Sequence, residues 1–196
     1  FDELLEMTAT GCPKPAMRSV EFARTHRVAL HVRSAFSWVP GTWVTEEAPM
    51  ERAIISAVTH DTSEAKMTVS GVADRPGVAA LLFRTLADAE VNVDMIVQNV
   101  SAEGRTDISF TLPHDQVVVA EAAVGSIGDE LGSDATVTDG DIARVSLIGA
   151  GMQTNPGVAA TMFETMSDSG INIEMISTSA IRISCVVRES QAEDAV

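Results

Sequence analysis

The sequence predicts an α+β protein built from two copies of a βαββαβ unit, and three observations lead to this fold class. First, segments 76–97 and 156–177 align without a gap at an offset of 80, and 11 of the 22 aligned positions are identical. Second, each segment follows a short apolar run and contains an amphipathic helical stretch. Third, residues 107–112 of the first copy alternate polar and apolar side chains, as a half-buried strand does. An internal repeat of this kind indicates a duplicated structural unit.

The first copy contains every element of such a unit. A polar turn at 61–65 leads into it, and a hairpin turn at 103–105 joins its two middle strands. We expect strands at 66–71, 91–100, 107–112 and 135–138, with helices at 77–89 and 114–127. These elements predict an antiparallel sheet with both helices on one face.

The second copy is incomplete at its end. We expect strands at 143–148, 171–177 and 181–187, a helix at 157–169, and the beginning of a second helix at 189–196. No closing strand follows, so we expect the strand predicted at 54–58 to join this sheet. The first unit, residues 63–140, would then be inserted in the second, which comprises residues 50–62 and 141–196.

Residues 1–49 do not belong to the repeat. Their pattern predicts helices at 2–7 and 18–25, a strand at 28–34, and a linker at 36–49. This piece has too little apolar surface to fold alone, so we interpret it as the tail of a larger domain.

Charge and composition exclude several classes of function. The net charge is −15, from 13 Lys and Arg against 28 Asp and Glu, which disfavours nucleic acids and anionic membranes as partners. No apolar run approaches the ~18 residues of a membrane-spanning helix, and no secretory start is present. Cys12 and Cys185 lie far apart in the sequence, which predicts reduced thiols in the cytoplasm. The four histidines show no metal-ligand spacing, so we expect no metal site.

No catalytic motif stands out in the chain. Glycine-rich dinucleotide loops, phosphate loops, the GxSxG elbow and the HExxH zinc motif are all missing. Gly149-Ala150-Gly151 follows a strand, but it lacks the third glycine of a dinucleotide site. We therefore expect no catalytic residue in this chain.

The repeated turn is the best candidate for a binding site. It reads Asp74-Arg75-Pro76-Gly77 in the first copy and Thr154-Asn155-Pro156-Gly157 in the second. Proline as the first helical residue, with Asp or Asn two positions earlier, is typical of helix N-termini. Free backbone amides there attract anions, so the turn could hold a carboxylate while Asp74 pairs with an ammonium group. The alternative is that Asp74 and Asn155 only cap their helices.

Asparagine recurs at a second place in both copies. Asn92 and Asn172 lie where each helix gives way to a strand, and we expect the stretch 92–94 to lie across from the turn. They either line a ligand slot or only satisfy the backbone of a turn.

These motifs resemble ACT domains, the small-molecule sensing modules of amino-acid metabolism with a ferredoxin-like fold. The match extends to the regulatory region of aspartokinase of the actinobacterial type, through Asp74-Arg75-Pro76-Gly77, residues 86–95, Asn155-Pro156-Gly157-Val158 and residues 173–179. The pattern Arg18-Ser19-Val20-Glu21 with His31-Val32-Arg33-Ser34 resembles the end of the amino-acid kinase domain. The resemblance implies that residues 1–49 are a remnant of that domain.

The resemblance also implies a function. Aspartokinase transfers a phosphoryl group from ATP to L-aspartate, and threonine or lysine bound between ACT units inhibits it. ATP and Mg²⁺ are expected only with the missing kinase domain, and the expected partners are a second copy of the chain or a catalytic subunit. The implied effector-binding residues are Asp74, Gly77, Ala79, Asn92, Val93, Gln98 and Ser101 in the first unit, and Asn155, Gly157, Val158, Asn172, Ile173, Ser177 and Thr178 in the second.

Three departures from the family pattern accompany these expectations. Ala180 stands where a Glu is usual, which weakens the case for a cationic effector, and the hairpin at 102–105 is shorter than usual. Pro13 and Pro15 stand where the family more often has Ser and aliphatic residues. The alternative function is an ACT dimerisation module that binds no effector.

Overall fold

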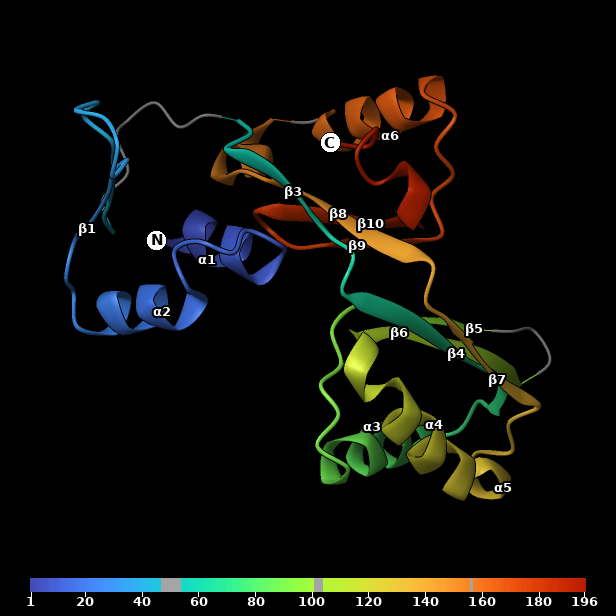
Figure 1. Cartoon of the computed structure of the whole chain (residues 1–196). Helices are drawn as coiled ribbons and strands as arrows, with labels where there is room; N and C mark the ends of the chain where they lie inside the picture. The colour runs from blue at the N-terminus through green and yellow to red at the C-terminus, as the bar shows by residue number, and fades with distance from the viewer. Residues whose placement is uncertain (47–53, 101–103, 156) are drawn as a thin grey trace.

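Two four-stranded antiparallel sheets, each with helices on one face, form the larger part of the computed structural model (Figure 1). The structure describes residues 1–46, 54–100, 104–155 and 157–196. A segment of two helices and a two-stranded sheet precedes the two larger units. The predicted α+β class, with an antiparallel sheet in each of two units, is confirmed.

The N-terminal segment, residues 1–46, differs from the prediction at one point. Its elements are α1 (Asp2–Ala9), α2 (Met17–Thr25), β1 (Leu30–Val32) and β2 (Thr42–Val44). The linker predicted at 36–49 is wrong in part, because β2 lies within it and pairs antiparallel with β1. Thr, Trp and Val all favour strands, and a partner strand was close enough in the chain to pair with them.

The first unit has the strand order β5-β6-β4-β7, as the βαββαβ pattern predicts. The strand predicted at 91–100 begins only at Ile96, because the amide of Val91 still closes the preceding helix by bonding to Leu86 O at 3.0 Å. The elements are β4 (Glu64–Ala73), α3 (Val78–Asp88), β5 (Ile96–Val100), β6 (Arg105–Pro113), η1 (His114–Gln116), α4 (Val117–Ser126), α5 (Gly128–Leu131) and β7 (Ala135–Asp139).

The second unit takes its first strand from before the first unit. β3 (Ala57–Asp61) pairs antiparallel with β8, so the prediction that a strand near 54–58 joins this sheet is confirmed. The strand lies three residues later than predicted, and the polar turn predicted at 61–65 is correspondingly shorter. The other elements are β8 (Ile142–Ile148), η2 (Ala150–Thr154), α6 (Val158–Asp168), β9 (Met175–Thr178), β10 (Arg182–Arg188) and η3 (Glu189–Gln191). The helix predicted at 189–196 amounts to a short 3₁₀ turn.

Each unit has its own apolar core between its sheet and its helices. In the first, α3 and α4 cover one face of the sheet (Figure 1), and Leu82 and Phe110 are fully buried there. The rings of Phe83 and Phe110 meet edge to face with their centroids 5.7 Å apart. In the second, Val145 and Cys185 pack against Met166 of α6. Burial raises the pKa of the Cys185 thiol to about 11, which keeps it protonated and unreactive at neutral pH.

The two units meet at a junction that the chain crosses twice. Thr62 and Ser63 join β3 to β4, and Gly140 and Asp141 join β7 to β8. Between these links lies a third apolar cluster that draws on both units. Its members are Met95, Val97, Ile142, Met175 and Val186.

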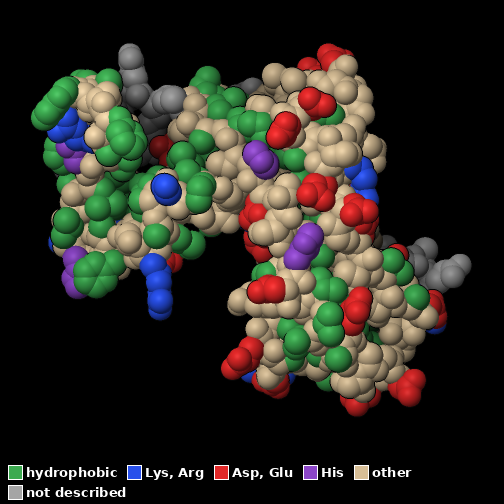
Figure 2. All heavy atoms as spheres, viewed as in Figure 1, with side chains coloured by type: hydrophobic (Ala, Val, Ile, Leu, Met, Phe, Trp, Pro, Cys, Tyr) green, Lys and Arg blue, Asp and Glu red, His purple; other side chains and the backbone are tan. Residues whose placement is uncertain are grey.

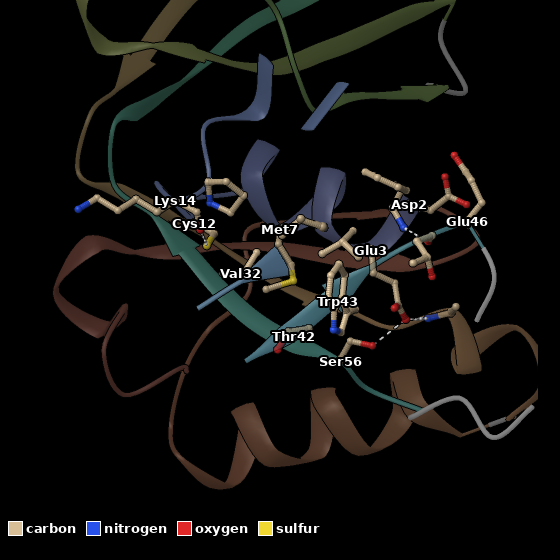
Figure 3. A pocket seen from close by; sticks show the side chains of 16 residues that line it. Asp2, Glu3, Met7, Cys12, Lys14, Val32, Thr42, Trp43, Glu46 and Ser56 are labelled. Carbon is tan, nitrogen blue, oxygen red and sulfur yellow. Dashed lines mark hydrogen bonds between the residues drawn. The ribbon is translucent and has the colours of Figure 1, made fainter. Parts of the chain in front are cut away.

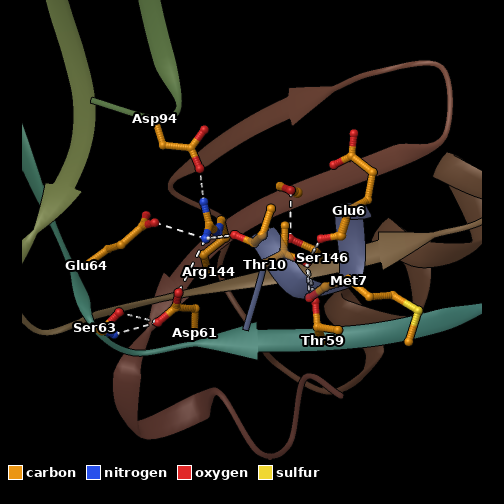
Figure 4. Close-up of polar contacts among 12 residues, drawn as sticks. Glu6, Met7, Thr10, Thr59, Asp61, Ser63, Glu64, Asp94, Arg144 and Ser146 are labelled. Atoms are coloured by element: carbon orange, nitrogen blue, oxygen red, sulfur yellow. Dashed lines mark hydrogen bonds and ion pairs between the residues drawn. The ribbon is translucent and has the colours of Figure 1, made fainter. Parts of the chain in front are cut away.

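Arg144 of β8 lies beside this cluster with its side chain only 2% exposed (Figure 4). One of its terminal nitrogens lies 3.0 Å from Glu64 Oε1 and 3.4 Å from Asp61 Oδ2. The same nitrogen donates to the carbonyl oxygen of Ala9, at 3.1 Å. The other terminal nitrogen pairs with Asp94. One buried cation thus faces three carboxylates, from β3, from β4 and from the loop between α3 and β5.

The carboxylates around Arg144 differ in how burial affects them. Burial raises the pKa of Glu64 above its ordinary value, and the pull of Arg144 does not offset this. Burial would raise the pKa of Asp61 as well, but two hydrogen bonds from Ser63 and the charge of Arg144 together lower the pKa of that carboxyl. A carboxyl whose pKa rises on folding binds its proton more tightly in the folded state, so ionised Glu64 destabilises the fold at neutral pH.

The core of the first unit gives a simple test of the fold. We expect Leu82→Ala to lower the free energy of unfolding by about 2–5 kcal/mol, because it removes fully buried methyl groups and leaves a cavity. Val118→Ala on α4 is the control, because Val118 is 76% exposed and its loss should cost less than about 0.5 kcal/mol. Urea unfolding followed by circular dichroism measures both. Equal losses would contradict the assigned core.

The junction gives a second test, based on pH. We expect Glu64→Gln to raise the melting temperature at pH 7, because the raised pKa of Glu64 makes its charge unfavourable in the folded state. The gain should disappear as the pH falls below about 4.5, where Glu64 is protonated in both states. Asp61→Asn should act in the opposite direction, with a loss at pH 7 that shrinks as the pH falls below the ordinary aspartate pKa of 3.8. A loss of stability from Glu64→Gln at pH 7 would show that its ion pair with Arg144 outweighs burial.

Candidate functional site

The two repeated turns enter their helices through left-handed glycines. Gly77 precedes α3 with φ of +97°, and Gly157 precedes α6 with φ of +99°. An added Cβ would meet no atom within 4 Å at either position, so the backbone angle and not the available space requires glycine. The first helical residue is therefore Val78 and not Pro76, which corrects the expectation of proline at that position. Pro156 lies outside the described residues.

The N-cap positions of α3 and α6 are occupied by Gly77 and Gly157, and not by Asp74 or Asn155. Asn155 Nδ2 donates to the carbonyl of Gly151 at 2.8 Å. The side chain of Asp74 is exposed, and its amide donates to Gly104 O at 2.9 Å. The amide of Val78 makes a long bond of 3.4 Å to Arg75 O, inside the turn itself.

Asn92 does not lie across from the turn of its own unit, so that expectation is wrong. Asp74 is bonded next to the start of β6, whereas the amide of Asp94 bonds to Thr111 near the end of β6, at 3.0 Å. Gly104 and Thr111 are seven residues apart along an antiparallel strand, a distance of about 24 Å. The turn thus lies at the far end of each unit, and the asparagine stretch lies at the junction.

The other predicted residues of the first unit are dispersed between these two ends. Ala79 is half-buried in the first turn of α3, and Gln98 is exposed on the edge strand β5. The amide of Asn92 donates to Gln116 Oε1 at 2.7 Å, and the side chain of Val93 packs against the core. Ser101 lies outside the described residues.

The second unit repeats this arrangement. Val158 begins α6 at the far end, while Asn172 is exposed near the junction and Ile173 packs against the core. Ser177 and Thr178 lie on β9, which is the edge strand of its sheet. The predicted residues of each unit therefore form two groups, one at the turn and one along an edge strand that starts at the junction.

The residues that follow the two asparagine stretches exchange ion pairs between the units. Asp94 pairs with Arg144 of the second unit, and Glu174 pairs with Lys66 of the first. Arg188 also donates to Glu174, at 2.5 Å, and to Asp139 Oδ2, at 2.6 Å. Burial would raise the pKa of Glu174, but the hydrogen bonds from Lys66 and Arg188 lower it overall. The Arg188 hydrogen bond likewise lowers the pKa of Asp139.

Sequence reasoning missed these ion pairs, although the repeat carried a signal for them. Lys66 and Arg144 each directly precede the apolar run of their copy's first strand, and Asp94 and Glu174 occupy aligned positions. When each of two copies carries a cation at one position and an anion at another, a two-fold arrangement lets the cation of one copy pair with the anion of the other.

The glycine run at the start of η2 does not form a phosphate site. The amide of Ala150 donates to Glu3 Oε1 at 2.9 Å, so a carboxylate of the chain already occupies it (Figure 3). Across the described ranges, His, Cys, Asp and Glu side chains nowhere gather in a group of three that could hold a metal ion. Within those ranges no helix combines the length and apolar character needed to cross a bilayer.

Comparison with known proteins places the chain in a family. Residues 55–126 and 145–196 match the ACT domain family. The aspartokinase of Mycolicibacterium smegmatis is 47% identical over 201 residues, an alignment that includes 100% of this chain and 48% of that protein. The chain thus spans about half the length of the curated relatives it matches.

Solved structures agree with this assignment. The regulatory subunit of aspartate kinase from Thermus thermophilus, in its ligand-free form, is 36% identical with a TM-score of 0.69, over 73% of this chain and 94% of that one. A crystal structure of aspartokinase alpha and beta subunits is 38% identical with a TM-score of 0.68, over 72% of this chain and 93% of that one. The chain therefore belongs to the aspartokinase family and carries its regulatory region of ACT domains.

Proposed function

We propose that this chain binds a free amino acid, threonine or lysine, and thereby controls an aspartokinase that converts ATP and L-aspartate to 4-phospho-L-aspartate. The observation that carries the proposal is the pair of exposed turns in which a left-handed glycine leads into a helix N-terminus, in a member of this regulatory family. Amides at such a terminus suit a carboxylate. The exposed carboxylate of Asp74 suits the ammonium group of the same ligand.

The separation of the turn from the asparagine stretch supports a site shared between two chains. A free amino acid is far shorter than the ~24 Å between the two ends of one unit. Edge strands β5 and β9 carry unpaired backbone groups along the predicted ligand residues Gln98, Ser177 and Thr178. A second copy that docks along such an edge would bring its own turn beside these residues. We therefore propose a homodimer through the ACT units.

The N-terminal segment supports a catalytic partner. Its surface exposes Phe22, Phe36, Trp38 and Trp43, and hydrophobic side chains gather over this part of the molecule (Figure 2). A cavity of about 520 Å³ opens on the same segment, between α1 and the β1–β2 hairpin (Figure 3). Exposed apolar surface of this extent is typical of an interface. We propose that residues 1–49 complete an amino-acid kinase domain, which holds the aspartate, ATP and Mg²⁺.

Two further features are consistent with this assignment. Cys12 and Cys185 are both free thiols, which fits work in the reducing cytoplasm. ATP and Mg²⁺ would bind the catalytic half and not this chain, since the Ala150 amide in the glycine run is held by Glu3.

Calorimetry with threonine and with lysine tests effector binding. We expect one of them to bind at or below millimolar concentration, and Asp74→Ala to weaken it about tenfold, because a charged hydrogen bond to the ammonium group is lost. Asp88→Ala is the matched control, since Asp88 is an exposed acid at the opposite end of α3. Absence of heat with both amino acids would favour the alternative, an ACT dimerisation module without an effector.

The exposed aromatic surface can be tested separately. We expect Phe36→Ser with Trp38→Ser to leave the melting temperature unchanged within about 2 °C, since the two side chains are 100% and 93% exposed. The same double variant should lose copurification with the N-terminal half of the Mycolicibacterium smegmatis relative. Val118→Ser, an exposed apolar position on α4, should retain it. Retained assembly of the double variant would refute this docking surface.

A further inference from the structure

Two ion pairs join the two units in a pseudo-two-fold arrangement. Lys66 stands opposite Asp139 in the first sheet, and Arg144 stands opposite Asp61 in the second. Lys66 then pairs with Glu174 of the other unit, as Arg144 does with Asp94. Each unit thus contributes one cation, and one carboxylate that lies two residues after its predicted ligand-binding asparagine.

The two ion pairs differ in what else their members touch. The recorded partners of Lys66, Glu174 and Arg188 lie within the two ACT units, in the part of the chain that the structure describes. Arg144 in addition donates to the carbonyl of Ala9, the last residue of α1. A cation at a helix C-terminus is favourable because it satisfies a carbonyl that has no partner within the helix.

A second contact fixes the same end of α1. The hydroxyls of Thr10 and Thr59 form a buried hydrogen bond of 2.7 Å, directly beside Arg144 (Figure 4). The amides of Thr10 and Cys12 both donate to Met7 O, at 3.3 and 3.0 Å, so this end of the helix is closed by a small set of bonds. The loss of one neighbouring contact would make the hydrogen bonds of these two amides break more often.

We infer that Arg144 is a positioning residue that couples the first ACT unit to the N-terminal segment: its two terminal nitrogens hold Asp94 on one side and the end of α1 on the other. A guanidinium group is planar and rigid, so a displacement of Asp94 is transmitted to the nitrogen that holds Ala9. Glu174 holds the equivalent position in the second unit, but among the described residues it pairs with Lys66 and Arg188, which lie in the ACT units. The second unit contacts α1 separately, through Arg182 and Glu6 at 3.1 Å, so the route through Arg144 starts from Asp94 and not from Glu174.

The coupling through Arg144 adds to the proposed function a route from the first ACT unit to the N-terminal segment. Its test needs no effector. If an effector binds at the asparagine stretch of the first unit, Asp94 lies two residues from it and would be the first charged group to move. This movement of Asp94 rests on the proposed function. The physical coupling from Asp94 to α1 exists in the protein without any amino acid, and can be measured in that state.

Hydrogen exchange measured by mass spectrometry tests the coupling in the full 196-residue chain. Asp94→Ala should speed exchange in the peptide covering residues 1–15 by roughly three- to tenfold, the effect of losing about one hydrogen bond. Among the described residues, Asp94 bonds to Thr111 and pairs with Arg144, so a purely local role would leave exchange at residues 1–15 unchanged. Glu174→Ala is the matched control and should leave this peptide within twofold of the unmodified protein.

A third variant and an internal reference complete the experiment. Arg144→Lys keeps the charge but replaces two terminal nitrogens in a planar fork with a single nitrogen, so it should loosen the contacts to Asp94 and Ala9 and also speed exchange at residues 1–15. The peptide covering β4 reports general destabilisation and should change little in Asp94→Ala. Unchanged exchange at residues 1–15 in Asp94→Ala, or an equal increase in Glu174→Ala, would overturn the inference. Calorimetry with threonine and lysine remains a separate readout, so loss of effector binding and loss of coupling are distinguishable.

Discussion

A single buried guanidinium determines how the parts of this molecule are held together. Arg144 contacts the link between the units through Asp61 and Glu64, the first unit through Asp94, and the N-terminal segment through Ala9. A buried cation is costly unless it is paired and hydrogen-bonded, so its position restricts where the surrounding carboxylates can lie. Burial raises the pKa of Glu64, and the neighbouring carboxylates Asp94 and Asp61 act in the same direction, so Arg144 does not offset the cost of its charge.

The repeat explains why most of the fold was accessible from the sequence. Local patterns are sufficient for βαββαβ units, because each strand and helix has a clear period and one buried face. The membership of β3 in the second sheet also followed, since a unit without its closing strand leaves a sheet edge to be filled. The strand Thr42–Val44 was missed because three residues are too few to show a period, and its stability comes from pairing with β1.

The candidate site was predictable in its residue types but not in its geometry. The two Pro-Gly turns were expected to begin a helix, and each does lead into one, but through a left-handed glycine and not through proline as the first helical residue. The position of Asn92 was not predictable in the same way, because the distance from Asp74 depends on the direction in which α3 returns along the sheet. The ion pairs of Lys66 and Arg144 depend on how the two copies meet at the junction, which no local pattern contains.

The double crossing of the chain at the junction limits how the two ACT units can move. Thr62-Ser63 and Gly140-Asp141 tether the same two bodies at separate points of the chain. One flexible tether would allow the bodies to drift apart and reorient freely, whereas two short ones define a line about which they turn. Relative motion is then reduced to a torsion about that line, so a change in one angle is enough to describe how the two units can reorient.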